Sequence, residues 1–244
     1  MNYFWQLRRE FTAFFYSPVA YVVIGISAIL NAATFFLILR FLSGAGPTAG
    51  APMEMLFSTA LFWLIVMTLT PLITMRTFAE EKHAGTLETL VTAPISDTRI
   101  VLAKYTAALA FYAIMWAPTL LYPVLLTRWT PVDPGPVLSG YTGTLAMGAM
   151  LVSIGVLCSA LTRNQIVAAI ITFAAMMGMF LAGLFSYVDG VSQAAVFQYV
   201  NLSSHMESFA RGIVDTRPLV YYASVAAMAL FLTVQVIGAR RWRR

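Results

Sequence analysis

The chain has 244 residues, of which 60% are apolar and only 10% are charged, and its mean hydropathy is +0.79. Soluble domains carry about 25% charged residues, so this composition excludes a water-covered globular surface and predicts an integral membrane protein. The net charge of +5 is explained below by membrane topology, and we expect no nucleic-acid partner.

Residues 1–16 are expected to form an interfacial helix that lies on the membrane surface. Its apolar and polar faces consist, respectively, of Phe4, Leu7, Phe11, Phe14 and Phe15 and of Gln6, Arg9, Glu10 and Ala13. The helix should end at Ser17 because proline, here Pro18, disfavours a helical conformation in the residue before it. The following apolar run is too long for a cleaved signal peptide, so we expect it to remain as the first span.

Six continuous apolar runs are long enough to cross a bilayer, which takes about 20 residues of helix. A transmembrane barrel would instead show short segments of alternating polarity. The sequence therefore predicts an all-α integral membrane protein, with a single transmembrane domain over 1–244. The spans are expected at about 19–39, 53–75, 100–127, 137–161, 165–188 and 218–238.

Proline and glycine predict local features of two spans. Pro71 should kink the second span near its inner end, because proline removes a backbone donor. Gly143, Gly148 and Gly155 in the fourth span favour close approach of neighbouring helices.

The outer segment 189–217, between the fifth and sixth spans, is expected to contain a short amphipathic helix. Ser204 and Glu207 have the spacing of a capping box, so we predict Ser204 as its N-cap.

The basic residues are divided unevenly between the two sides of the predicted bundle. With the N-terminus inside, eleven Lys and Arg residues fall inside and four, Arg40, Arg128, Arg211 and Arg217, fall outside. This agrees with the positive-inside rule, which the reverse topology would violate. We therefore expect a multi-pass protein of the cell (inner) membrane with both termini in the cytoplasm.

The cytoplasmic segment 76–99 joins the second and third spans. The second span should continue as helix through Lys82, and Gly85 then permits a sharp turn. Residues 86–92 predict a two-turn helix with Leu87 and Leu90 on one side, which is too short to be stable alone in water.

This short helix needs a surface to dock on, either the lipid headgroups or a cytoplasmic protein. Glu80, Glu81 and Glu88 favour the protein, because the inner leaflet is itself anionic.

The same segment carries a family resemblance. The run Glu80-Glu-Lys-His-Ala-Gly-Thr-Leu-Glu-Thr-Leu, followed by Ala-Pro-Ile-Ser and Ile100-Val-Leu-Ala-Lys, resembles the coupling-helix region of type-2 ABC exporter permeases. The likeness extends to Leu161-Thr-Arg-Asn-Gln-Ile-Val-Ala-Ala, Ser208-Phe-Ala-Arg-Gly-Ile-Val-Asp and the closing Arg240-Arg-Trp. It thus covers nearly the whole chain. The branch it looks most similar to is that of the single-domain permeases related to gliding-motility and copper-site-maturation transporters.

The resemblance implies an export permease without enzymatic activity of its own, which forms the translocation pathway within the membrane lipid. Its partners would be a second permease chain, identical or a sister subunit, and cytoplasmic ABC ATPase subunits. ATP and Mg would bind to those subunits, and no cofactor is expected here because the chain lacks the GxxxxGK[ST] phosphate loop. The residues implied at the ATPase-coupling contact are Glu80, Glu81, Gly85, Thr86, Leu87, Glu88 and Leu90.

Two other classes of protein remain as alternatives. An intramembrane enzyme is disfavoured because the only histidines, His83 and His205, fall on opposite sides of the membrane. A metal centre built from histidines and carboxylates near the bilayer midplane is therefore not expected. A channel or ion-coupled secondary transporter usually carries ionisable groups inside its bundle. The centres of the six runs lack such groups, which favours a passage that is opened mechanically.

Overall fold

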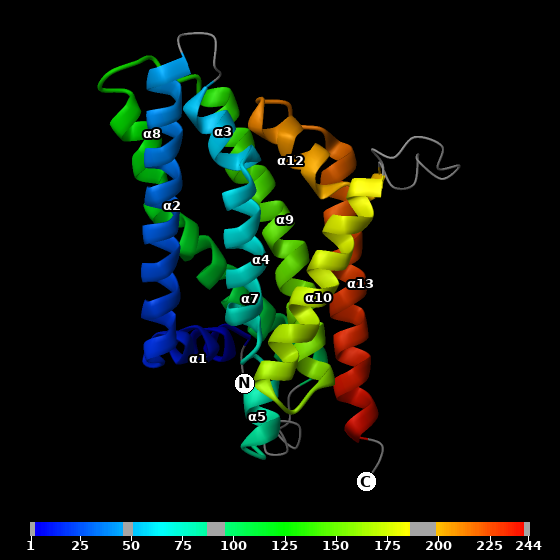
Figure 1. Cartoon of the computed structure of the whole chain (residues 1–244). Coiled ribbons are helices and arrows are strands. Elements are labelled where there is room, and N and C mark those ends of the chain that lie inside the picture. The colour runs from blue at the N-terminus through cyan, green and yellow to red at the C-terminus, as the bar shows by residue number, and fades with distance from the viewer. Residues whose placement is uncertain (1–2, 46–50, 87–95, 186–198, 242–244) are drawn as a thin grey trace.

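The computed structural model describes residues 3–45, 51–86, 96–185 and 199–241, and the secondary structure within these ranges is entirely helical (Figure 1). Six helical stretches are long and apolar enough to cross a membrane, which confirms the predicted all-α class and the six spans. The elements are α1 (Tyr3–Tyr16), α2 (Pro18–Ala45), α3 (Pro52–Ser58), α4 (Ala60–Thr74), α5 (Ala79–His83), α7 (Asp97–Trp116), the 3-10 helix η1 (Ala117–Leu120), α8 (Leu121–Leu126), α9 (Pro134–Leu161), α10 (Gln165–Leu184), α12 (Leu202–Ala210) and α13 (Thr216–Arg241).

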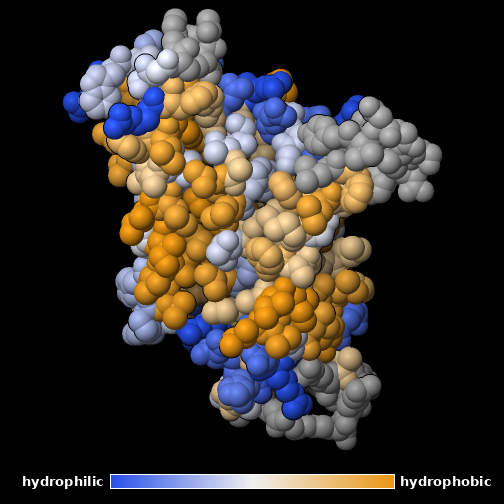
Figure 2. Space-filling view, in the orientation of Figure 1, coloured by the Kyte–Doolittle hydropathy of each residue, from blue (hydrophilic) through white to orange (hydrophobic). Residues whose placement is uncertain are grey.

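The helices form an elongated bundle with a distinct polarity along its axis. Figure 1 shows α1 lying across the end of the bundle where α5 and the C-terminus also lie, whereas α12 crosses the opposite end. Figure 2 shows a hydrophobic belt across the visible face, bounded by hydrophilic residues at both ends. This distribution suits a bundle whose middle faces lipid and whose ends face water.

The α1 helix packs against α7 with residues from both of its predicted faces. Gln6 is 1% exposed, whereas Phe4 is 68% exposed. Phe14 stacks on Phe111 of α7, with ring centroids 5.2 Å apart. The predicted division into an apolar membrane face and a polar water face was therefore wrong for Gln6 and Phe14, whereas Phe4 and Arg9 are exposed. Polar and aromatic side chains both turn toward protein, because α1 docks on α7 as well as lying at the bundle end.

The second predicted span is divided into α3 and α4. Thr59 between them has an extended backbone (φ −69°, ψ 148°) and its N–H donates to the carbonyl of Met55. Pro71 lies inside α4, which continues to Thr74. The interruption thus falls at the outer end of the span.

The α9 helix is the central element of the bundle and contacts α4, α7, α10, α12 and α13. Three of its glycines make these close approaches possible, as the sequence predicted. A Cβ atom added at Gly148 would lie 2.1 Å from the Tyr112 ring, and one at Gly155 would lie 2.2 Å from Thr74. Gly143 faces Phe209 of α12 in the same way, at 2.6 Å.

The outer helix α12 is present, but its N-cap is Asn201 and not Ser204. The Asn201 side chain accepts from the backbone N–H groups of Ser203 and Ser204. The Ser204 hydroxyl donates to the Asn201 carbonyl instead. An asparagine three residues earlier competes successfully because asparagine is at least as good an N-cap as serine.

Candidate coupling site

The described part of the segment between α4 and α7 begins with a turn, not with the continuous helix predicted through Lys82. The α4 helix ends at Thr74, and α5 begins at Ala79. The cause lies in α9, where the Ser159 hydroxyl accepts from the N–H groups of Phe78 at 3.1 Å and Ala79 at 3.0 Å. The same hydroxyl donates to the Met75 carbonyl at 3.0 Å. One hydroxyl thus uses its full hydrogen-bonding capacity to replace the helical ladder at three backbone groups.

The α5 helix is held to α9 at its other end as well. The Lys82 ammonium donates to the Ala160 carbonyl, next to Ser159. Beyond α5, Gly85 has a φ of +71°, the left-handed conformation that the predicted sharp turn requires and that glycine adopts without strain.

A buried lysine joins α5 to two further helices. Lys104 of α7 is 3% exposed, and its ammonium lies 2.8 Å from Glu10 of α1 and 2.7 Å from Glu81 of α5. It also lies 5.3 Å from the centre of the Phe78 ring. We call Glu10, Glu81 and Lys104 the Lys104 junction. A lysine this deeply buried is retained in proteins when it is paired, and here two carboxylates share it.

The electrostatics of the Lys104 junction favour the charged form of Glu10. Burial acts to raise the pKa of Glu10, but the positive charge of Lys104 and the hydrogen bonds from Arg9 and Lys104 outweigh it and leave the pKa below its ordinary value of 4.5. The Arg9 guanidinium lies 2.7 Å from Glu10. Glu10 is therefore ionised throughout the physiological pH range.

A second link ties the turn before α5 to the bend between α1 and α2. Arg76 donates to the Ser17 hydroxyl at 2.6 Å, and its Nε atom lies 4.0 Å from a Glu80 carboxylate oxygen. The α5 helix is thus connected to α1 at two points, through Glu81 and through Arg76.

The comparison with protein families decides what kind of chain carries this arrangement. Residues 53–239 match the family described as ABC-2 family transporter protein. The chain belongs to this family. A comparison with curated proteins finds no match. The chain is therefore the membrane-spanning permease component of an ABC transporter, a transport subunit and not a catalytic one.

The matched range of this ABC-2 permease includes two members of the Lys104 junction. Glu81 and Lys104 lie within it, whereas Glu10 precedes it. The family also implies an ATP-binding partner subunit, because an ABC-2 permease supplies only the membrane component.

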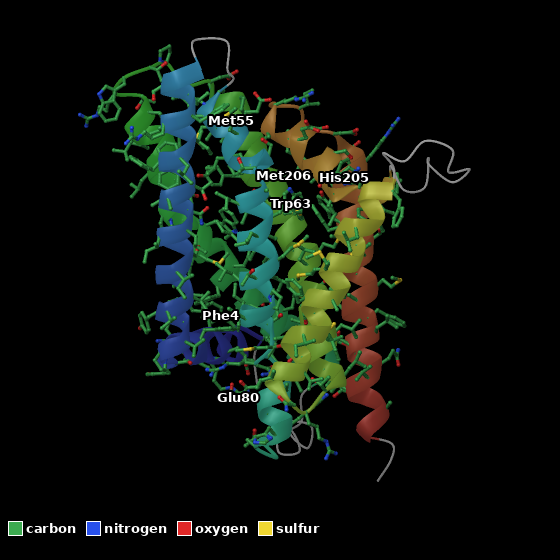
Figure 3. All side chains as sticks on the ribbon, in the orientation of Figure 1. Phe4, Met55, Trp63, Glu80, His205 and Met206 are labelled. Atoms are coloured by element: carbon green, nitrogen blue, oxygen red, sulfur yellow. The ribbon has the colours of Figure 1, made fainter. Side chains whose placement is uncertain are left out.

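The predicted coupling residues of the permease are placed unevenly. Glu81 lies in the Lys104 junction, and Glu80 is exposed beside it near the lower end of the bundle (Figure 3). Gly85 and Thr86 are exposed at the end of the described segment. Three predicted coupling residues lie outside the described residues, namely Leu87, Glu88 and Leu90. Of the two-turn helix predicted over 86–92, only Thr86 is described.

Residues that the sequence analysis did not select complete the site. Glu10, Arg76, Lys104 and Ser159 make the contacts that hold α5 in place. Lys104 was detectable, because it is the only charged residue within the predicted span 100–127 and a charge in a span usually marks a specific partner. Nothing in the sequence pointed to Ser159.

Proposed function

We propose that this ABC-2 permease is the transmembrane subunit of an ATP-driven exporter, and that residues 80–92 couple it to a separate ATP-binding subunit. The observation that carries the proposal is the anchoring of α5, which directly precedes the predicted docking helix. Its anchors are the Lys104 junction to α1 and α7 and the Ser159 hydrogen bonds to α9.

Such anchoring suits the transmission of force. A helix of five residues is not stable alone, so α5 keeps its position only through contacts with neighbouring helices. A displacement imposed on the residues after Gly85 would therefore be passed to α1, α7 and α9 together. Because packed elements move as units, this would turn a local push by the ATPase into a movement of the spans.

The remaining parts of the proposal rest on the sequence. The uneven distribution of basic residues supports an orientation with α1, α5 and both termini in the cytoplasm. In this orientation the protein would reside in the cell (inner) membrane. The resemblance supports export, a pair of permease chains in the membrane lipid, and ATP with Mg on the partner subunits. The narrower likeness to gliding-motility and copper-site-maturation permeases stays a prediction.

Co-purification from the native membrane tests the proposal. We expect a stoichiometric ATPase subunit with a phosphate loop to accompany the chain in mild detergent, and to be lost when Leu87 and Leu90 are both changed to Asp. The matched control is Val214→Asp, which adds a charge at an exposed apolar position beyond α12, at the opposite end of the bundle. A chain that carries no ATPase under these conditions would contradict the proposal and favour a channel or secondary transporter.

A further inference from the structure

A polar cavity of about 410 Å³ lies between α1, the turn before α5 and Lys104. Three acidic and two basic side chains line it, namely Glu10, Glu80, Glu81, Arg76 and Lys104. Its volume falls within the range of small-molecule sites in proteins, about 300–1,000 Å³. The cavity lies at the level of α1, where the hydrophobic belt of the surface gives way to hydrophilic residues (Figure 2).

Two buried polar atoms of the cavity residues have no hydrogen-bond partner among the described residues. They are the donor Nε of Arg76 and the acceptor Oε2 of Glu81. Buried polar groups are normally paired with protein, water or a ligand. One open donor and one open acceptor in a single cavity indicate an occupant that carries both an acceptor and a donor.

The charge of the cavity narrows the chemistry of that occupant. Glu10 and Glu81 together more than neutralise Lys104, and among the described residues Arg76 is the only further basic group that lines the cavity. An anion would gain from Arg76 but would meet three carboxylates. A simple cation would leave the Nε of Arg76 without a hydrogen-bond acceptor, since the nearest carboxylate oxygen, on Glu80, is 4.0 Å away. A zwitterion satisfies both ends, with its anionic group on Arg76 and its cationic group on Glu81.

A shallow apolar crevice continues from this cavity toward the hydrophobic belt. The two share Phe14, Ser17 and Arg76, and the crevice adds Val23 of α2, Leu72 of α4 and Phe111 of α7. At about 30 Å³ the crevice is too small to enclose an acyl chain, but its apolar residues border the path that a chain would follow from the cavity toward the hydrophobic belt. A polar cavity with such an apolar border matches a phospholipid headgroup followed by an acyl chain.

We propose that the cavity binds the headgroup of phosphatidylethanolamine from the leaflet on the α1 side, with one acyl chain lying along Leu72 at the surface of the bundle. The phosphate accepts from Arg76, and the primary ammonium donates to Glu81 and Glu80. Phosphatidylcholine has no N–H donor for the carboxylates, and phosphatidylglycerol has no cation. The site therefore discriminates by headgroup chemistry. It rests on the proposed function only in naming this leaflet as the cytoplasmic one.

The bound lipid would act as a third connection between α1 and α5. It would touch both existing links, the Arg76–Ser17 hydrogen bond and the Lys104 junction, and would exclude water from them. Charge-assisted hydrogen bonds strengthen when water is excluded, so occupancy would stiffen the connection on which the proposed coupling depends.

Native mass spectrometry of the purified chain tests the proposal, after incubation with equal amounts of phosphatidylethanolamine, phosphatidylcholine and phosphatidylglycerol. We expect one retained phosphatidylethanolamine per chain, favoured about tenfold over each of the others, as one hydrogen bond between charged groups provides. Arg76→Gln should reduce this preference to about twofold or less. Equal retention of the three lipids by the unmodified chain would overturn the proposal.

A second variant leaves every charge in place. Leu72 is half-buried and lines the crevice but not the polar cavity. Leu72→Trp should therefore obstruct the path of the acyl chain and reduce the retained phosphatidylethanolamine to about the level of the other two lipids. Arg8→Gln is the matched control, since Arg8 is exposed on α1 and lines neither space. Retention that is unchanged in both Arg76→Gln and Leu72→Trp would overturn the proposal. The presence or absence of a co-purified ATPase is a separate readout, so failure here is distinguishable from failure of the proposed function.

Discussion

Replacement of Lys104 by methionine is the sharpest test of the Lys104 junction. Methionine has a similar length and keeps the apolar packing, but it leaves Glu10 and Glu81 facing each other without the shared ammonium. Removing one partner of a buried ion pair costs about 3–5 kcal/mol. The side chains of Glu10 and Glu81 are 12% and 24% exposed, and Arg9 still pairs with Glu10, so we expect the lower end, about 3 kcal/mol.

Two quantities are measured: the Tm of the purified permease in detergent, and the ATP hydrolysis rate of the proposed ATPase subunit with and without the permease. For a chain of this size, about 3 kcal/mol corresponds to a Tm lower by about 6–12 °C. Arg99→Met is the matched control, because Arg99 is exposed on the same helix, and it should change Tm by less than about 2 °C, as surface substitutions usually do.

A variant without charges at the junction separates the effect of losing the lysine from the effect of leaving two buried carboxylates unpaired. Lys104→Met combined with Glu10→Gln and Glu81→Gln should recover most of the lost stability, because neutral replacements of buried ion pairs are often close to neutral in free energy. Coupling to the ATPase should remain impaired, since the link between α1, α5 and α7 is weaker. A Tm for Lys104→Met equal to that of the unmodified chain, or a triple variant no more stable than the single one, would refute the reasoning.

Three further predictions follow from other contacts. Ser159→Ala removes the hydroxyl that bonds to three backbone groups and should lower the free energy of unfolding by about 2–3 kcal/mol. Backbone amides of the turn before α5 should then exchange hydrogen faster, and unchanged exchange there would contradict this role. Gly148→Ala should lower the free energy of unfolding by about 1–3 kcal/mol, because the added methyl group overpacks against Tyr112. Gly178 has open space around it, so Gly178→Ala is the control and should leave Tm unchanged. Equal Tm values for the two variants would count against close packing at Gly148. Burial lowers the pKa of His205 below 6.5 despite the opposing charge of Asp215, so stability should be full above pH 6.5 and fall as the pH decreases below it; His205→Gln should abolish the difference between melting curves at pH 8 and pH 5.5.

The spans were predictable because each depends on its own composition. A run of about 20 apolar residues has few alternatives in a bilayer, and the bend at Ser17 follows from the proline after it. The close packing at Gly148 and Gly155 was also predictable, since small residues in a span leave room for a neighbour.

The turn before α5 was not predictable, because its cause lies elsewhere in the fold. The turn before α5 is fixed by Ser159, which is about 80 residues away in sequence. Local sequence around Met75 and Phe78 contains no strong helix breaker, so propensity favoured a continuous helix. A tertiary hydrogen bond overrode it, as tertiary context commonly does.

The sequence proposed a segment for the candidate site but not the contacts of that segment with the rest of the fold. The pattern from Glu80 onward located the segment that faces the cytoplasm in the proposed orientation. It did not reveal that Glu81 is paired with Lys104, or that Glu10 on the supposed polar face of α1 completes the pair. Such pairings join residues 94 and 23 positions apart, and periodicity within one helix says nothing about them.

The order of these charges along the chain has a consequence for biogenesis. A ribosome completes Glu10 and Glu81 before it reaches Lys104, so both counter-charges have been synthesised by the time the lysine enters the insertion machinery. Lys104 is therefore never inserted while one of its partners has still to be translated. A circularly permuted gene that begins at α7 would reverse this sequence of events, and its product would present an uncompensated cation to the bilayer from the first helix onward.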